Sequence, residues 1–129
     1  MVIRRNISSG APWEPIAGYS RGVRLGNVVE VGGTTAQGGD VITGGGDVYA
    51  QTQWALAKIR KALSAVANLF KDVVSTRIFV TYVAQWEAVG RAPGEVFGEI
   101  RPVTSMVEVK ALIDPQMLMG IEATAIIST

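Results

Sequence analysis

Few residues in this chain could do chemistry, because two of the most versatile side chains are missing. The 129 residues include neither histidine nor cysteine. Their absence removes the commonest general base, the thiolate nucleophile, disulfide bonds and the commonest ligands of transition metals. Chemistry here must rest on carboxylates, hydroxyls, backbone groups, Arg, Lys or bound water, and we expect no metal and no other cofactor.

Glu122 is the most unusual of the carboxylates. It lies in residues 118–127, where side chains alternate between two faces and few other charges occur. Alternation with a period of two predicts a strand. A carboxylate in mid-strand must reach water, a donor or a cation, because burying it alone is very costly. The residues leave two interpretations open: a carboxylate in a pocket, or a buried one bonded to backbone or Thr.

The last part of the sequence contains two strand patterns, and a further pattern of strand and turn residues lies near the start. A run at residues 103–110 also alternates, and Asp114-Pro115 supplies a turn before the run that holds Glu122. The motifs VEVKAL (Val107–Leu112) and IEATAI (Ile121–Ile126) resemble the closing strands of the RidA (YjgF) family. Residues 19–35 are similar to its opening, with a strand led by Tyr, a Gly-Asn turn and a strand ending Gly-Gly-Thr-Thr.

The resemblance implies both an architecture and a site. It implies an α+β, chorismate-mutase-like fold, a homotrimer and small-molecule pockets between subunits. Members of this family, also called endoribonuclease L-PSP-like proteins, include deaminases that hydrolyse 2-imino and enamino acids to 2-oxo acids and ammonia. Carried over to this chain, the resemblance makes Glu122 the catalytic holder of the attacking water. Tyr19 lines the pocket, and Gly33 and Thr34 contribute backbone to its floor.

The chain departs from the active pattern where the family binds the substrate carboxylate. The family places an arginine three residues before the first valine of its V-x-V motif, and that position is Thr104 here. A hydroxyl cannot reproduce the bidentate clamp of a guanidinium. Arg101, Arg24 or Arg77 are the candidate replacements, with Arg101 first. Gly90, where the family often carries Asn, is a second departure.

Each candidate also has a structural interpretation. Arg101 could be a cation that complements the end of a helix dipole. Arg77 could form an ion pair at a subunit contact or sheet edge. Tyr19 could be a packed aromatic whose hydroxyl meets backbone. We favour the structural interpretation for both arginines and the pocket for Tyr19, which the resemblance supports.

The elements that must position these residues follow from periodicity. Apolar spacings of three and four predict a helix at 48–69, with Asp47 as N-cap, and a second at 85–100, kinked or restarted at Pro93. Alternation predicts a long strand at 73–83. We interpret Trp13-Glu14 as loop and residues 38–46 as a flexible glycine-rich connection. The expected order is β-β-β-α-β-α-β-β, in one domain over 1–129, with two helices on one face of a mixed sheet.

Composition limits the partners. The net charge is +1, which gives no electrostatic reason to expect nucleic acid or membrane. No apolar run is long enough to span a bilayer, so we expect a cytoplasmic protein. Apolar residues on both faces of the sheet make assembly through its open face sensible.

Three functions remain open. The first is a hydrolase of the C–N bond of imines, enamines or related reactive metabolites. The second is a non-catalytic metabolite-binding module, and the third is a protein-interaction module. Whether the chain is an enzyme, and on which substrate, stays open at this point.

Overall fold

A six-stranded mixed sheet organises the computed structural model, which describes residues 2–39, 41–67 and 69–128. Its strands lie in the order β1-β2-β3-β8-β6-β7. Their bounds are β1 Arg4–Ile7, β2 Gly22–Leu25, β3 Val28–Thr34, β6 Val73–Val80, β7 Val103–Glu108 and β8 Met119–Ile126. Neighbouring strands are antiparallel except β6 and β7, which are parallel. The parallel pair requires a crossover, and α3 (Trp86–Phe97) supplies it.

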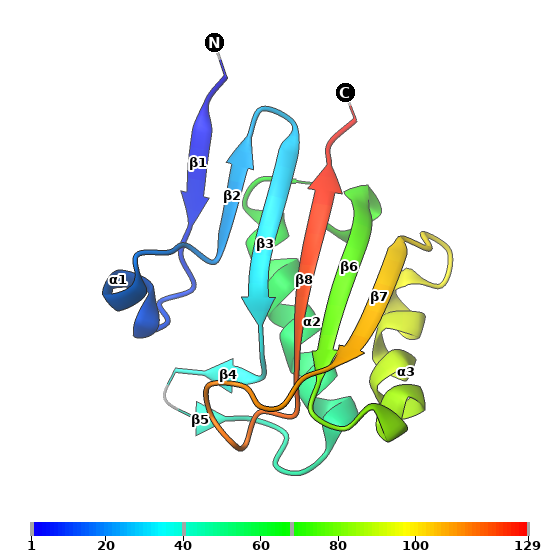
Figure 1. The fold of residues 1–129 in the computed structure, drawn as a ribbon. Helices are drawn as coiled ribbons and strands as arrows, with labels where there is room; N and C mark the ends of the chain where they lie inside the picture. The colour runs from blue at the N-terminus through cyan, green and yellow to red at the C-terminus, as the bar shows by residue number, and fades with distance from the viewer. Residues whose placement is uncertain (1, 40, 68, 129) are drawn as a thin grey trace.

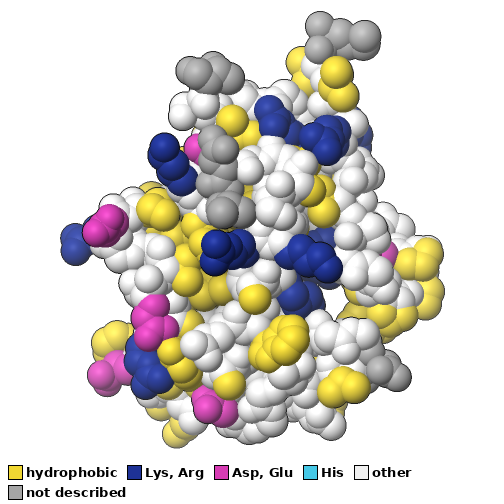
Figure 2. All heavy atoms as spheres, turned by 180° about the vertical axis from the view of Figure 1, so that it is seen from behind, with side chains coloured by type: hydrophobic (Ala, Val, Ile, Leu, Met, Phe, Trp, Pro, Cys, Tyr) yellow, Lys and Arg dark blue, Asp and Glu magenta, His cyan; other side chains and the backbone are white. Residues whose placement is uncertain are grey.

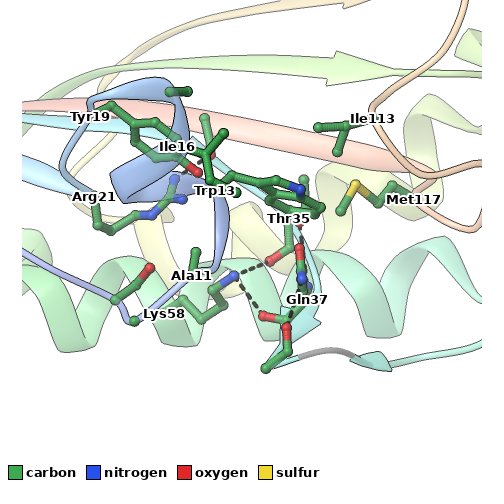
Figure 3. Close-up of a pocket in the computed structure, with 15 residues that line it drawn as sticks. Ala11, Trp13, Ile16, Tyr19, Arg21, Thr35, Gln37, Lys58, Ile113 and Met117 are labelled. Atoms are coloured by element: carbon green, nitrogen blue, oxygen red, sulfur yellow. Dashed lines mark hydrogen bonds between the residues drawn. The ribbon is translucent and has the colours of Figure 1, made fainter.

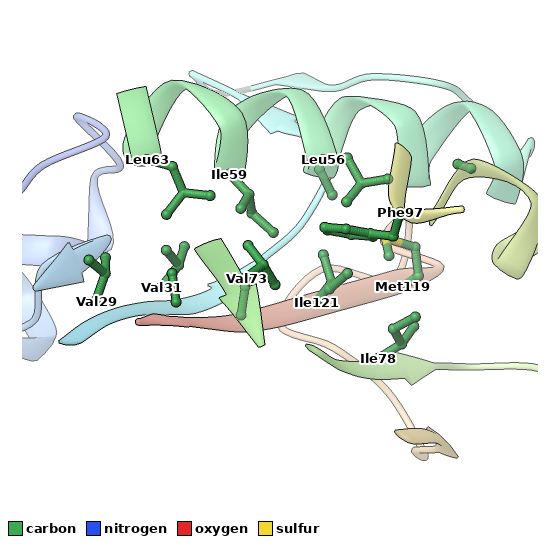
Figure 4. Packing of buried hydrophobic residues seen from close by; sticks show 14 of the residues in the cluster. Val29, Val31, Leu56, Ile59, Leu63, Val73, Ile78, Phe97, Met119 and Ile121 are labelled. Carbon is green, nitrogen blue, oxygen red and sulfur yellow. The ribbon is translucent and has the colours of Figure 1, made fainter. Parts of the chain in front are cut away.

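Helix α2 (Val48–Ser64) and α3 both lie behind the sheet in Figure 1, on the same face. The predicted α+β class, with a mixed sheet and two helices on one face, is confirmed. The core forms where the apolar side of α2 meets the inward side chains of the central strands (Figure 4). Ile59 and Leu63 are fully buried there, against residues such as Val31 and Ile121.

Strand β6 differs from its predicted pattern at one end. Uninterrupted alternation placed Val73 on the face of Arg77, but Val73 is buried in the core and Val74 is exposed. The register of β6 against β8 shifts between Val73 and Ser75. A bulge of this kind inserts one extra residue and reverses which side chains point inward.

Two segments predicted as loop contain regular structure. Trp13–Ala17 forms the short helix α1, and Gly18 ends it in the left-handed conformation (φ 72°) with its N–H donating to the Glu14 carbonyl. Proline in the first turn and glycine at the end are typical of a helix. Within the glycine-rich connection, β4 (Gln37–Gly38) and β5 (Val41–Ile42) pair as a two-stranded ribbon.

The helix and strand ends also need correction. Helix α2 ends at Ser64, and a 3₁₀ turn, η1, follows at Leu69–Asp72. Strand β6 stops at Val80, and a second 3₁₀ turn, η2, occupies Val83–Gln85. Helix α3 continues through Pro93, so of the two expected alternatives, a kink or a restart at that proline, the restart is wrong.

Gln51 connects the start of α2 to two loops. Its side chain is fully buried, although the helical pattern placed it off the apolar stripe. Its amide donates to the carbonyls of Gly45 and Gln116 at 2.8 Å each and accepts from the N–H of Leu118 at 2.9 Å. One side chain thereby holds both the glycine-rich connection and the β7–β8 loop against α2.

We predict that Gln51→Ala destabilises the protein by about 2 kcal/mol, because it removes three hydrogen bonds to partly buried backbone groups of two loops. Chemical denaturation would measure the change. Gln53→Ala, on an exposed part of the same helix, should change the stability by less than about 0.5 kcal/mol. Equal effects of the two substitutions would contradict this role for Gln51.

Candidate functional site

A cavity of about 440 Å³ lies between α1, the end of β3, α2 and the β7–β8 loop. Two of the predicted site residues, Tyr19 and Gly33, line it. Figure 3 shows Trp13, Ile16 and Tyr19 along one side of this space, with Ile113 and Met117 at its far end. Thr34 lies beneath it, fully buried, and its hydroxyl donates to the carbonyl of Gly32 at 2.8 Å.

Strand β3 is irregular at Gly33, which lines the cavity. The register of β3 against β8 shifts between Val31 and Thr34. A bulge takes a residue out of the hydrogen-bonded ladder. The chain thus places Gly33 in the wall of the cavity, where its carbonyl accepts from Arg21.

Arg21 contributes a buried guanidinium to the same cavity. Its side chain is only 7% exposed, and its Nη1 donates to the carbonyl of Gly33 and, at 3.4 Å, to the hydroxyl of Thr34. The guanidinium carbon lies 5.6 Å from the centre of the Tyr19 ring, within the range of a cation–π contact. Its Nε is buried without a hydrogen-bond partner.

Lys58 of α2 brings a second cation. Its Nζ donates to the carbonyls of Thr35 at 3.1 Å and Gln37 at 2.7 Å, as the dashed lines in Figure 3 show. Burial, the largest cause, and the positive charge of Arg21 together lower the pKa of Lys58 to about 8, although Glu14 acts in the opposite direction. Lys58 is therefore mostly charged at pH 7 and loses its proton about two pH units earlier than an ordinary lysine.

Glu14, on α1, is a buried carboxylate that is held by neutral groups. It accepts from the hydroxyl of Ser8 at 2.9 Å, and from the N–H of Ser9 at 3.0 Å. Burial acts to raise the pKa of Glu14, but the hydrogen bonds from Ser9 and Ser8 outweigh burial and keep the pKa below its usual value. Glu14 is therefore ionised at neutral pH.

Glu122 lies elsewhere, on the open face of the sheet. Its Oε1 accepts from Nε of Arg77 at 2.7 Å, and about a third of its side chain is exposed. Arg77 also lies 4.0 Å from Glu30. The carboxylate is thus neither buried nor bonded to Thr, and the described residues that line the 440 Å³ cavity do not include it.

Thr104 and Arg101 lie together at a third place. Both line a depression of about 390 Å³ between β7 and α3, with Gly90 and Met106. The Thr104 hydroxyl is 2.8 Å from that of Thr76. Arg101 has a left-handed backbone (φ 54°) after α3, and its Nε donates to the carbonyl of Gly98 at 3.1 Å. This placement fits the helix-end interpretation of Arg101 and leaves it beside position 104.

A single chain therefore assembles the predicted residues in two groups and one separate carboxylate. Tyr19 and Gly33 share the cavity, Thr104 and Arg101 share the depression, and Glu122 is on the sheet face. Arg24 and Arg77 were the other candidates to replace the family arginine. Arg24 donates to the carbonyls of Gly26 and Val66, and Arg77 donates to the carboxylate of Glu122.

Arg21 and Lys58 were not predicted as site residues. The spacing of two between Tyr19 and Arg21 in an extended segment was a usable signal, since it places both on one side. Nothing near Lys58 in the sequence indicates that α2 carries its amine to the end of β3.

The described residues hold no group of three or more Asp or Glu side chains placed to bind a metal ion. Within that same part of the chain, no helix has the length and apolarity needed to cross a bilayer.

Comparison with known proteins places this geometry in a family. The model of the family described as endoribonuclease L-PSP matches residues 9–127. An uncharacterized protein of Streptomyces coelicolor, SCO2049, is 38% identical over 121 residues, which cover 94% of this chain and 90% of that protein. The 3-aminoacrylate deaminase RutC of Acinetobacter baylyi is 32% identical over 121 residues, covering 92% and 94%.

Solved structures agree with the sequence relatives. Rv2704 of Mycobacterium tuberculosis, a member of the YjgF/YER057c/UK114 family, has a TM-score of 0.88 and 47% identity, over 97% of this chain and all of that one. The YjgF protein of E. coli has a TM-score of 0.81 and 28% identity, over 95% and 98% of the two chains. Sequence and structure together show that this chain belongs to the RidA/YjgF family of endoribonuclease L-PSP-type proteins.

Proposed function

We propose that this protein is a hydrolase of reactive imines or enamines, acting as a deaminase in pockets completed by neighbouring subunits of a homotrimer. The observation that carries the proposal is the placement of Glu122, an oriented and accessible carboxylate in the middle of β8. One relative with 32% identity is named as a deaminase of 3-aminoacrylate, which is an enamine. That name supports the reaction class and does not supply the substrate of this chain.

The chemistry needs little more than a held water molecule. Water adds to the carbon of C=N while one of its protons passes to nitrogen, which gives the carbinolamine. The remaining hydroxyl proton passes to nitrogen as the C–N bond breaks, so that a carbonyl compound and ammonia form. An enamine enters this sequence after it tautomerises to its imine. Glu122 orients the water and accepts its proton, as a carboxylate general base can. Arg77 limits the rotation of this carboxylate through the 2.7 Å contact. Backbone of Gly33 and Thr34, with Tyr19, completes the pocket in this proposal.

Assembly through the open sheet face would bring these separate groups together. Neither α2 nor α3 covers that face. Val103 and Val107 of β7 share it with Arg77, because they pair with Ser75 and Phe79 of β6. Both valines are exposed in the single chain, Val103 by 74%. Exposed apolar residues gathered on one face are typical of a subunit interface.

A second candidate is a pocket that binds a metabolite without turnover. The replacement of the family arginine by Thr104 favours this alternative, since a hydroxyl provides no charge for a carboxylate. In that case Glu122 and Arg77 are a structural ion pair. The two candidates differ in whether removing the charge of Glu122 changes a rate or only an affinity.

We predict that the protein accelerates the loss of 2-imino acids generated in situ by an amino-acid oxidase, measured as the decline of the semicarbazide-trapped imine. Glu122→Gln should lower the rate by at least about 100-fold, because it removes the general base. Glu30→Gln, which removes a neighbouring carboxylate on the same face, should change it less than about threefold.

Activity that survives in Glu122→Gln would exclude the proposed role of this residue. No acceleration across a panel of imines would exclude the hydrolase for those substrates and leave the binding module.

We also predict that Val107→Glu dissociates the assembly, since a charge in an apolar contact must be desolvated. Analytical ultracentrifugation should give a trimer for the unmodified protein and a monomer for this variant. Val41→Glu, a change of the same kind at an exposed valine of β5, should remain trimeric. A monomeric unmodified protein would contradict the proposed assembly.

A further inference from the structure

A second cavity lies next to the one beside Tyr19, between the end of β1, β4 and α2. It has a volume of about 320 Å³, and its apolar walls come from Ile7, Trp54, Ala62 and Ala65. Figure 2 views the helix-covered side of the molecule and shows Lys and Arg side chains gathered beside a hollow. A concave site with apolar walls and few polar groups is the usual form of a small-molecule site.

Lys58 is the residue of α2 that lies where the two cavities meet. It lines both of them, and its side chain is neither fully buried nor exposed. Trp54, one turn earlier on the same helix, is 45% exposed and lines only the second cavity. A molecule that enters the second cavity along Trp54 therefore reaches the amine of Lys58.

The amine of Lys58 is held in a geometry that suits its neutral form. Its Nζ donates to the carbonyl of Thr35 at 3.1 Å and to the carbonyl of Gln37 at 2.7 Å (Figure 3). A charged lysine has three N–H groups, whereas a neutral amine has two and a lone pair. When both N–H groups of the neutral amine are donated to the two carbonyls, its lone pair points away from them. The backbone thus orients a nucleophile.

The surroundings of Lys58 also favour the neutral amine. Burial and the positive charge of Arg21 lower its pKa to about 8, against the opposite effect of Glu14. About a tenth of such amines are neutral at pH 7, compared with roughly one in two thousand for an ordinary lysine. A desolvated lysine next to another cation is an established way to activate this side chain as a nucleophile.

We propose that Lys58 is a covalent site for small aldehydes: its amine condenses with the carbonyl carbon, and the hydrocarbon chain lies in the second cavity against Trp54 and Ala65. An aldehyde fits because its carbonyl carbon carries only one hydrocarbon substituent, which leaves the approach of a held amine open. Lys61, which borders the cavity, is exposed. Solvent therefore satisfies the charge of Lys61, and the aldehyde need not carry an opposite one.

The condensation requires no other reactant. The nitrogen lone pair forms a bond to the carbonyl carbon as the C=O π bond breaks, and a proton passes from nitrogen to oxygen to give the carbinolamine. The hydroxyl group then takes up a proton and leaves as water, while nitrogen loses its remaining proton and the C=N bond forms. Hydrolysis reverses the sequence. This inference goes beyond the proposed function, because no step involves Glu122.

We predict that butanal reacts with Lys58 ahead of the other lysines, Lys61, Lys71 and Lys110. Sodium cyanoborohydride reduces the imine to a stable butyl amine, and mass spectrometry of peptides measures the butyl groups at each amine of the intact protein. At pH 7 Lys58 should react at least about tenfold faster than the other lysines. Its rate should saturate as the butanal concentration rises, since the cavity holds the aldehyde before it reacts, whereas the other rates should stay linear.

The amino terminus and two variants make this result decisive. An α-amino group ordinarily has a pKa near 8, so its rate shows what a low pKa gives without a cavity, and Lys58 should exceed it at least about threefold. Trp54→Ala removes an apolar wall and should lower the rate at Lys58 at least about threefold. Lys61→Arg keeps the charge at the border and should leave the rate at Lys58 unchanged.

Thermal unfolding shows whether each variant is folded. If Trp54→Ala does not fold, Ala65→Leu decides, because it narrows the same cavity at an exposed position and should lower the rate in the same way. The site would be overturned by a rate at Lys58 no higher than at the amino terminus, by a rate that stays linear in butanal, or by equal rates in the unmodified protein and the cavity variant.

The preference for Lys58 should also depend on pH. Arg21, Glu14, Tyr19 and Lys61 are the titratable or charged groups near Lys58 on the described elements around it. With its pKa of about 8, Lys58 loses its proton above this pH, whereas an ordinary lysine stays charged until about pH 10. The ratio of the rate at Lys58 to the rate at Lys110 should therefore fall several-fold between pH 7 and 9.5. A constant ratio would contradict the activated amine.

Glu122→Gln separates this inference from the proposed function. We expect butanal to react with Lys58 at the same rate in this variant and in the unmodified protein, while the variant loses imine hydrolysis. Rapid reaction at Lys58 in a protein that hydrolyses no imine would leave the aldehyde site and reject the hydrolase. Imine hydrolysis without rapid reaction at Lys58 would reject the aldehyde site and leave the hydrolase.

Discussion

The packing of α2 across the sheet is the interaction on which the other features depend. Its apolar side, with Ile59 and Leu63, closes the core. Its polar groups act at both edges of that contact: Gln51 holds two loops, and Lys58 holds the carbonyls of Thr35 and Gln37. The helix therefore sets the position of the end of β3. The cavity walls follow from this placement, because the bulge at Gly33 and the β7–β8 loop are fixed relative to α2.

The charged residues described above form two groups, which lie on different sides of the sheet. Glu122 and Arg77 pair on the open face, which no helix covers. Arg21, Lys58 and Glu14 meet at the side where α1 and α2 approach the end of β3. Burial strengthens electrostatic interactions and makes unpaired groups costly. Lys58 accordingly has a pKa below its usual value, whereas Glu122 is paired with its neighbour Arg77.

The motifs near the end of the chain predicted an arginine at the position of Thr104, and the structure shows what surrounds Thr104. Thr104 is hydrogen-bonded to Thr76 and lies with Arg101 in a depression beside α3. The Arg101 side chain turns back to the helix end. Arg21 instead lines the separate cavity beside Tyr19.

Sequence alone determined the long elements, the α+β class and the family, because periodicity and the two closing motifs depend only on local order. It also selected Tyr19 and Gly33, which share a cavity. Three features could not be predicted from periodicity and depend on the tertiary structure. They are the bulge that turns Val73 inward, the helix at Trp13 and the burial of Gln51. The tertiary structure also decided the meeting of Arg21 with Lys58. These residues are 37 positions apart, and only the packing of α2 against the end of β3 brings their charges to one place and lowers the pKa of one of them.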